Sequence, residues 1–196
     1  MKQAFAVWIT GLPASGKSMI AEVLAQRLAA LHFDVAVLES DALRTILTPR
    51  PTYTAEERDT FYRAMTFIGT LLVTHGVPVI FDATANRRQY REEARTTIAR
   101  FVEVFVDCPL AVCVQRDPKG IYRRARGAAA ATVPGLQVPY EPPLSAELVV
   151  RGDRDSPEVA ADQIIRVLTT KGYLTDSDGQ RPPSADRATI EDASKQ

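Results

Sequence analysis

The chain has 196 residues, and its 24 Lys and Arg balance 24 Asp and Glu, so the formal net charge is zero. This balance excludes a protein that coats nucleic acid or a membrane through bulk positive charge, although a local cluster of one sign remains compatible with it. The length suits one domain with a sizeable core. Two cysteines outside any CxxC pair and no apolar run of about 20 residues predict a cytoplasmic protein without a disulfide framework or a membrane span.

Strand and helix patterns alternate along the chain. Apolar, β-prone runs predict buried strands at residues 4–9, 35–38, 77–81, 101–106 and 148–150. Helical spacing and helix-start residues predict helices at 17–31, 55–75 and 87–100, from near Pro109, and from Ser156-Pro157-Glu158 through Leu168. This alternation predicts an α/β domain with a mostly parallel five-stranded sheet flanked by helices.

Two stretches fall outside the alternation. Gly127 to Pro143 joins an alanine run to several prolines, which predicts a long loop, and long loops in compact domains often serve as lids. Thr175 to Gln196 is polar and rich in Asp, Ser and Pro, so we expect a disordered tail. The predicted organisation is one domain over residues 1–174, with a lid at about 120–143, followed by a tail over 175–196.

The first predicted strand runs into a phosphate-loop motif. Gly11-Leu12-Pro13-Ala14-Ser15-Gly16-Lys17-Ser18 matches G-x-x-x-x-G-K-[ST] and opens a predicted helix, which is the context that the motif needs. The glycines let backbone N–H groups turn toward phosphate oxygens, and a helix N-terminus favours their charge. We expect Lys17 to reach the β- and γ-phosphates of ATP and the Ser18 hydroxyl to ligate Mg²⁺. The sequence therefore predicts a P-loop NTPase fold that binds a nucleotide at residues 11–18.

Charged residues follow the next two predicted strands. Asp41 stands where it can accept a proton from an acceptor hydroxyl or hold a Mg²⁺-bound water, and Arg44 can hold an anionic acceptor. Asp82 ends an apolar strand, which is the placement of a Walker-B-like carboxylate that orders a Mg²⁺-bound water. At both places the alternative is a helix cap, with a solvated arginine beside the first.

Five basic residues are packed between Arg116 and Arg126, just before the predicted lid. A lid over a polyphosphate needs positive charge to neutralise the charge that moves during phosphoryl transfer, whereas a solvated helix face is the alternative. One domain with a lid favours a small-molecule kinase. A nucleotide-binding regulatory protein without turnover is the rival class, and the presence of both Lys17 and Asp41 argues against it.

From about Phe5 to Leu174 the chain resembles the adenylyl-sulfate kinases. The most specific matches are Arg116-Asp117-Pro118-Lys119-Gly120-Ile121-Tyr122 and Pro139-Tyr140-Glu141-Pro142-Pro143-Leu144. The resemblance implies that ATP, with Mg²⁺, phosphorylates the ribose 3′-hydroxyl of adenosine 5′-phosphosulfate, and that the protein is a homodimer. Its partners would be small molecules, with no nucleic acid and no membrane, and the product could serve sulfate assimilation or the sulfation of a metabolite.

The resemblance also implies roles for individual residues. Lys17 and Asp41 would be catalytic, Arg116 would join residues 11–18 in holding the nucleotide, and Asp41 and Asp82 would reach Mg²⁺ through water. The acceptor would be held by Arg44, Tyr53, Arg58, Arg63 and Lys119, with Tyr53 stacked on an adenine.

The acceptor half departs from the family pattern. The family's E-N-x-R-R appears as Thr60-Phe61-Tyr62-Arg63-Ala64, so an Asn and an Arg are lost. The I-S-P-Y-R segment appears as Thr84-Ala85-Asn86-Arg87-Arg88, and Val133 stands where the family's lid has the Phe that stacks on adenine. These changes leave open a different hydroxyl acceptor, such as a sugar or a nucleoside derivative.

Overall fold

The computed structural model describes residues 4–126 and 132–174. Its centre is a five-stranded sheet in the order β2-β3-β1-β4-β5, and every pairing is parallel. The strands are β1 (Ala6–Thr10), β2 (Ala36–Glu39), β3 (Val79–Asp82), β4 (Phe101–Asp107) and β5 (Leu148–Arg151). The prediction of a parallel α/β sheet is confirmed, and no strand end is shifted by more than two residues.

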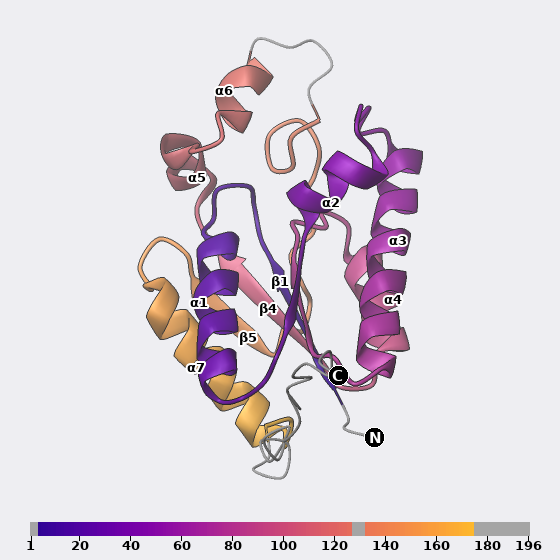
Figure 1. Cartoon of the computed structure of the whole chain (residues 1–196). Coiled ribbons are helices and arrows are strands. Elements are labelled where there is room, and N and C mark those ends of the chain that lie inside the picture. The colour runs from indigo at the N-terminus through magenta and orange to yellow at the C-terminus, as the bar shows by residue number, and fades with distance from the viewer. Residues whose placement is uncertain (1–3, 127–131, 175–196) are drawn as a thin grey trace, which may run out of the picture.

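Helices cover both faces of this sheet (Figure 1). On one face α1 (Lys17–Ala30) packs beside α7 (Pro157–Thr170), and on the other α3 (Ala55–Thr74) packs beside α4 (Arg88–Thr97). The shorter helices are α2 (Ser40–Leu47), α5 (Leu110–Arg116) and α6 (Ile121–Arg126). None of the helices within the described ranges is long and apolar enough to cross a membrane.

Strand β1 shows why the sequence predicted a buried strand. Val7 and Ile9 pack into the cluster under α1 and α7, while Ala6 and Trp8 pack into the cluster under α3 and α4. Successive side chains of a strand point to opposite faces, so a strand covered on both faces is apolar at every position. All five residues of β1 are buried.

Two helices were not predicted, and one was predicted too long. Helix α2 is only eight residues long, and although Leu43, Ile46 and Leu47 have helical spacing, Ile46 and Leu47 are exposed, so the apolar pattern is short and does not mark a core helix. The six-residue α6 lies inside the span predicted as a lid. Helix α4 ends at Thr97 rather than at residue 100, because Ile98 adopts an extended conformation and turns into the core. The predicted tail at 175–196 and part of the predicted lid, 127–131, lie outside the described residues.

The carboxyl ends of the parallel strands lie together at one end of the molecule (Figure 1). Asp82 at the end of β3 is in register with Ile9 of β1 on one side and with Glu39 of β2 on the other. The loop that follows Thr10 therefore begins beside Asp82, and Glu39 lies one strand further away. In open parallel sheets this edge is where ligands bind.

Candidate active site

The phosphate loop passes from β1 into α1 through backbone conformations that require glycine. Gly11 has φ 151°, and a Cβ atom there would lie 2.6 Å from the Val106 carbonyl oxygen and 2.9 Å from Ser15 Oγ. Gly16, with φ 107°, is the N-cap residue of α1. Both glycines adopt conformations that L-residues rarely reach, so the loop can turn its N–H groups inward at the start of a helix.

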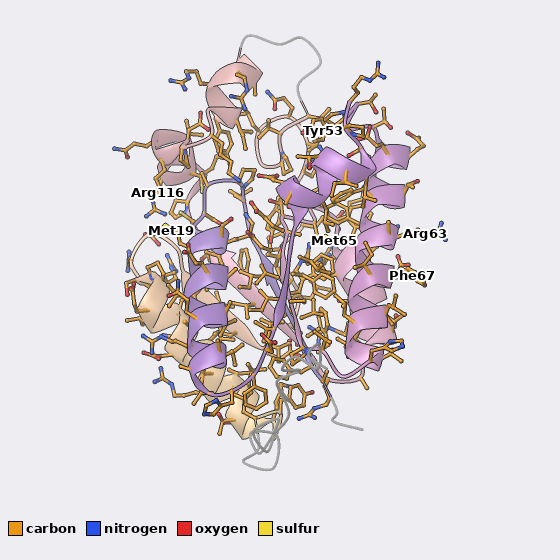
Figure 2. All side chains as sticks on the ribbon, viewed as in Figure 1. Met19, Tyr53, Arg63, Met65, Phe67 and Arg116 are labelled. Carbon is orange, nitrogen blue, oxygen red and sulfur yellow. The ribbon has the colours of Figure 1, made fainter. Side chains whose placement is uncertain are left out.

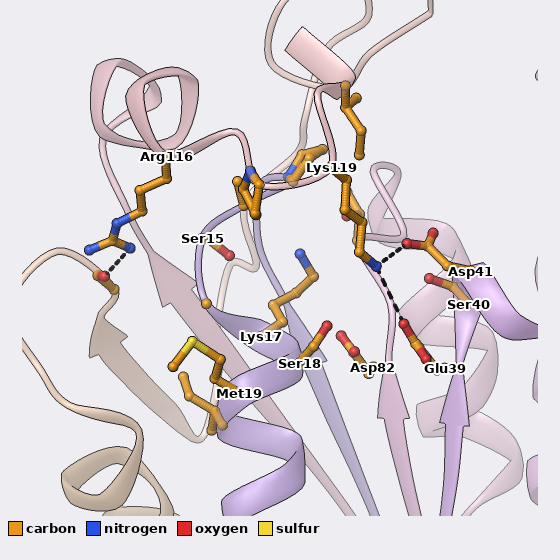
Figure 3. Close-up of a pocket in the computed structure, with 18 of the residues that line it drawn as sticks. Ser15, Lys17, Ser18, Met19, Glu39, Ser40, Asp41, Asp82, Arg116 and Lys119 are labelled. Carbon is orange, nitrogen blue, oxygen red and sulfur yellow. Dashed lines mark hydrogen bonds and ion pairs between the residues drawn. The ribbon is translucent and has the colours of Figure 1, made fainter. Parts of the chain in front are cut away.

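Lys17, at the start of α1, and Asp82, at the end of β3, are both buried and lie close to Ser18 (Figure 3). Burial lowers the pKa of Lys17, and the nearby charge of Asp82 opposes that shift. Burial likewise raises the pKa of Asp82, against the opposing effects of Lys17 and of a hydrogen bond with Ser18. The Lys17 ammonium donates to the Leu12 carbonyl at 2.8 Å. A phosphate in the loop would offer this buried cation a stronger, charged acceptor.

Ser15 supplies a further sign that the loop is built for a ligand. Its Oγ is buried and has no hydrogen-bond partner among the described residues. A buried hydroxyl without a partner is costly, so such a group in a native protein calls for an explanation, and a bound polar ligand supplies one.

A cavity of about 520 Å³ opens above the loop. Its lining joins residues from distant parts of the chain: the loop and the start of α1, the ends of β2 and β3, the turn between α5 and α6, and the segment after β5. Most of the predicted nucleotide-binding, catalytic and Mg²⁺-binding residues meet here with one predicted acceptor-binding residue, Lys119; the others are Pro13, Ala14, Ser15, Gly16, Lys17, Ser18, Asp41, Asp82 and Arg116. The volume lies in the usual range for small-molecule sites.

Lys119 reaches across this cavity to the carboxylates of Glu39, at the end of β2, and of Asp41, at the start of α2 (Figure 3). Its Nζ lies 2.6 Å from Asp41 Oδ2 and 3.4 Å from Glu39 Oε1. The bond to Asp41 raises the pKa of Lys119. Glu39 was not predicted as a site residue from the sequence, although it stands two residues before Asp41.

Arg116 lies on the opposite side of the cavity from Lys119 (Figure 3). Its Nη1 donates to the Gly152 carbonyl at 2.7 Å, which ties α5 to the segment that follows β5. The predicted nucleotide-binding arginine therefore lines the cavity and also holds one of its walls in place.

Two further predicted acceptor residues, Arg44 and Arg58, are buried beside the cavity around Tyr53 rather than in its lining. The Arg44 Cζ lies 3.8 Å from the ring centroid of Phe61 and 5.1 Å from that of Tyr53. Arg58 donates to the Tyr53 carbonyl at 3.1 Å and to the Thr132 carbonyl at 2.7 Å, and burial lowers its pKa. The Glu57 carboxylate also pairs with Arg44, at 3.5 Å, so this cationic cluster is held by rings, carbonyls and one carboxylate.

Arg63 is not brought to this cluster. It is exposed on the outer side of α3 (Figure 2). Five residues along an α-helix turn the chain by about 140°. Because Arg58 faces inward with Phe61 and Met65, Arg63 must face outward. Phe61 is the aromatic contact of Arg44 that the sequence reasoning missed, and only its place in the altered E-N-x-R-R segment marked it.

The oxygen ligands at the cavity suit Mg²⁺ bound together with a phosphate. Within the described ranges no three His, Cys, Asp or Glu side chains gather as ligands for a metal ion. Mg²⁺ commonly keeps several waters and takes only one or two protein ligands alongside substrate phosphates. The Ser18 hydroxyl and the carboxylates of Asp41 and Asp82 line the same cavity and fit that mode of binding.

Comparison with known proteins identifies the family. The family model for adenylylsulphate kinase matches residues 3–151. The adenylyl-sulfate kinase of Gloeothece citriformis is 43% identical over 175 residues, covering 89% of this chain and 99% of that protein. The structure of the Mycobacterium tuberculosis APS kinase in complex with AMPPNP and APS superposes with a TM-score of 0.80 at 32% identity, over 86% of this chain and 99% of that one.

A second solved structure, the hexameric APS kinase from Thiobacillus denitrificans, matches with a TM-score of 0.64 at 26% identity, over 89% of this chain and 30% of that one. The resemblance inferred from the sequence motifs is thus confirmed, as is the P-loop kinase fold. The chain belongs to the adenylyl-sulfate kinase family of phosphotransferases.

Proposed function

We propose that the protein transfers the γ-phosphoryl group of ATP to the ribose 3′-hydroxyl of adenosine 5′-phosphosulfate. The observation that carries the proposal is the convergence of a phosphate loop, two carboxylates and a basic crossing residue on one cavity, in a chain of this family. The cationic cluster around Tyr53 lies beside that cavity and suits an anionic acceptor.

The donor would lie in the phosphate loop. Its phosphates would accept from the loop N–H groups and from Lys17, which would then leave the Leu12 carbonyl. Mg²⁺ held by Ser18, with Asp41 and Asp82 acting through water, would neutralise charge on the β- and γ-phosphates. Arg116 would border the nucleotide on the side of Gly152.

In the transfer step the 3′-oxygen attacks the γ-phosphorus, and the bond from that phosphorus to the bridging oxygen of ADP breaks. Asp41 is the carboxylate placed to accept the hydroxyl proton. Lys119, which donates a hydrogen bond to Asp41 in this structure, would supply positive charge to the transferred group. Arg44 and Arg58 would hold the phosphosulfate, and Tyr53 would stack on the adenine. Arg63 has no part in this scheme because it faces away from the site.

A different hydroxyl acceptor, such as a sugar or a nucleoside derivative, is the second candidate. Val133 favours it, because an aliphatic side chain stands where the family stacks a ring on adenine. Val133 packs against a buried cluster of Cys108, Cys113 and Tyr122. An adenine would lose the stacking contribution there, which is about 1–3 kcal/mol for bases on aromatic rings.

Acceptor-dependent release of ADP separates these possibilities. The protein is incubated with MgATP and either adenosine phosphosulfate or a panel of sugars, with Lys17→Ala as the matched inactive control. We expect release only with adenosine phosphosulfate and only from the wild type. Release with a sugar alone would favour the second candidate, and no acceptor-dependent release would favour a regulatory nucleotide-binding protein. Homodimer formation and a cytoplasmic location stay predictions.

A further inference from the structure

The lid segment is taken as the two described flanks of the predicted lid, residues 120–126 and 132–143. Two tyrosines connect it to the phosphate loop and to Thr10, the residue just before that loop. Tyr122 in α6 donates its hydroxyl to the Pro13 carbonyl at 3.1 Å. Tyr140, on the returning flank, has its hydroxyl 3.0 Å from Thr10 Oγ1. Both tyrosines belong to the motifs that are most specific to the family, and neither has a role in the transfer step proposed above.

The direction of the second bond follows from its neighbours. Thr10 Oγ1 donates its single proton to the Thr84 carbonyl at 2.7 Å, so the hydroxyl of Tyr140 must donate to Thr10. Burial raises the pKa of Tyr140 to about 12 and also raises the pKa of Tyr122. Both phenols therefore remain protonated donors at neutral pH.

A third contact lies between these two bonds. Gly135 packs so closely on Leu12 that a Cβ atom at Gly135 would lie 2.5 Å from Leu12 Cδ2. The lid segment thus contacts Thr10, just before the loop, and Leu12 and Pro13 within it. The Leu12 carbonyl also accepts from Lys17, which would have to leave it to bind a phosphate.

The same segment also reaches the acceptor side. Thr132 accepts from Arg58 through both its carbonyl oxygen, at 2.7 Å, and its Oγ1, at 3.2 Å. Further along, Asn86 in the loop after β3 donates to the Pro139 carbonyl at 3.1 Å. One short stretch of chain therefore lies in contact with the phosphate loop, the β3 loop and the cationic cluster.

We propose that Tyr122 and Tyr140 are positioning residues that couple the lid segment to the phosphate loop, so that nucleotide phosphates in the loop fix the placement of Thr132 and Arg58 at the acceptor. This coupling rests on the proposed binding of a nucleotide in the loop and does not depend on which acceptor is used. The hydroxyls of the two tyrosines provide the polar contacts of this coupling, and Gly135 packed on Leu12 provides the apolar contact.

Phenylalanine variants remove the two hydroxyls and keep the rings. The Tyr140 ring stacks on Phe105, with centroids 6.0 Å apart and an interplanar angle of 20°, and the Tyr122 ring is buried, so Tyr122→Phe and Tyr140→Phe retain their packing. Tyr90→Phe is the matched control. Tyr90 is as buried as Tyr122, and its hydroxyl donates to Asp59 at 2.6 Å, away from the phosphate loop.

The decisive readout is amide hydrogen exchange over residues 132–141 with and without AMPPNP and MgCl₂, at a nucleotide concentration that saturates each variant. We expect nucleotide to slow exchange in the wild type and in Tyr90→Phe, and to have little effect in the double variant Tyr122→Phe/Tyr140→Phe. Each single lid variant should also lose about three- to tenfold in kcat, which is the range for one neutral hydrogen bond, with a smaller change in KM for ATP.

Protection in the double variant equal to that of the wild type, or no protection in the wild type, would overturn the coupling. A kcat loss no larger than that of Tyr90→Phe would do the same. Failure of the proposed function is a separate result, namely nucleotide binding without phosphorylation of adenosine phosphosulfate, and the exchange measurement still decides the coupling in that case.

Discussion

Replacing Phe61 by leucine removes the ring that lies nearest to the guanidinium of Arg44. The Arg44 Cζ lies 3.8 Å from the Phe61 centroid, and Phe61 is 1% exposed, so the pair is desolvated. A desolvated cation–π pair contributes about 2 kcal/mol. If that energy holds Arg44 ready for an anion, its loss weakens acceptor binding by up to about 30-fold. We expect KM for adenosine phosphosulfate to rise about 5- to 30-fold and KM for ATP to change little.

Phe5→Leu is the matched control, because Phe5 is buried to the same extent, packs in the cluster on the other face of the sheet and lies away from Arg44. Both variants lose packing on the order of 1–2 kcal/mol, which thermal unfolding measures. Steady-state kinetics with each substrate varied in turn then separates packing from positioning. An acceptor KM for Phe61→Leu within twofold of that for Phe5→Leu, at equal loss of melting temperature, would refute the positioning of Arg44 by Phe61.

Other expectations follow from groups already described. Because burial lowers the pKa of Lys17, its ammonium deprotonates at a lower pH than a free lysine. The affinity for AMPPNP, measured by calorimetry, should therefore fall as the pH rises toward that lowered pKa. The weaker affinity of Lys17→Met should not change with pH. Arg91 and Glu103 form a buried ion pair at 2.6 Å, and Glu103 also pairs with Arg95 at 3.1 Å. Arg91→Met, which leaves Glu103 only Arg95, should reduce the free energy of unfolding in urea by up to about 3–5 kcal/mol, and Arg91→Met/Glu103→Leu should reduce it by less; equal losses would contradict this reasoning. Val133→Phe should tighten adenosine phosphosulfate about tenfold if its adenine stacks there, and unchanged affinity would point to another acceptor.

The parts of the molecule that could be predicted were those with a local signature. The phosphate loop combines fixed residue spacing with a strand before it and a helix after it. Strand β1 is buried throughout and apolar at every position except Thr10, because helices cover both of its faces. The order of the strands, with β1 between β3 and β4, is not a local property and had to come from the structure.

The sequence predicted which residues belong to the site better than it predicted which residues they contact. Lys119 and Asp41 were both named as site residues, but their direct bond joins positions 78 residues apart. The contact of Arg58 with Thr132 spans 74 residues. Arg63 was assigned from its place in a motif, whereas the turn of α3 decides which side of the helix it occupies. Spacing along the chain predicts a residue's chemistry, and packing decides which groups it meets.

The most direct measurement is the identity of the product formed from MgATP and adenosine 5′-phosphosulfate, read by mass spectrometry and ³¹P NMR. We predict one added phosphoryl group, attached to the ribose 3′-oxygen, with one ADP released for each product and no product from Lys17→Ala. Unchanged adenosine phosphosulfate at saturating substrate, with phosphate appearing instead on a sugar or on water, would contradict the proposed function.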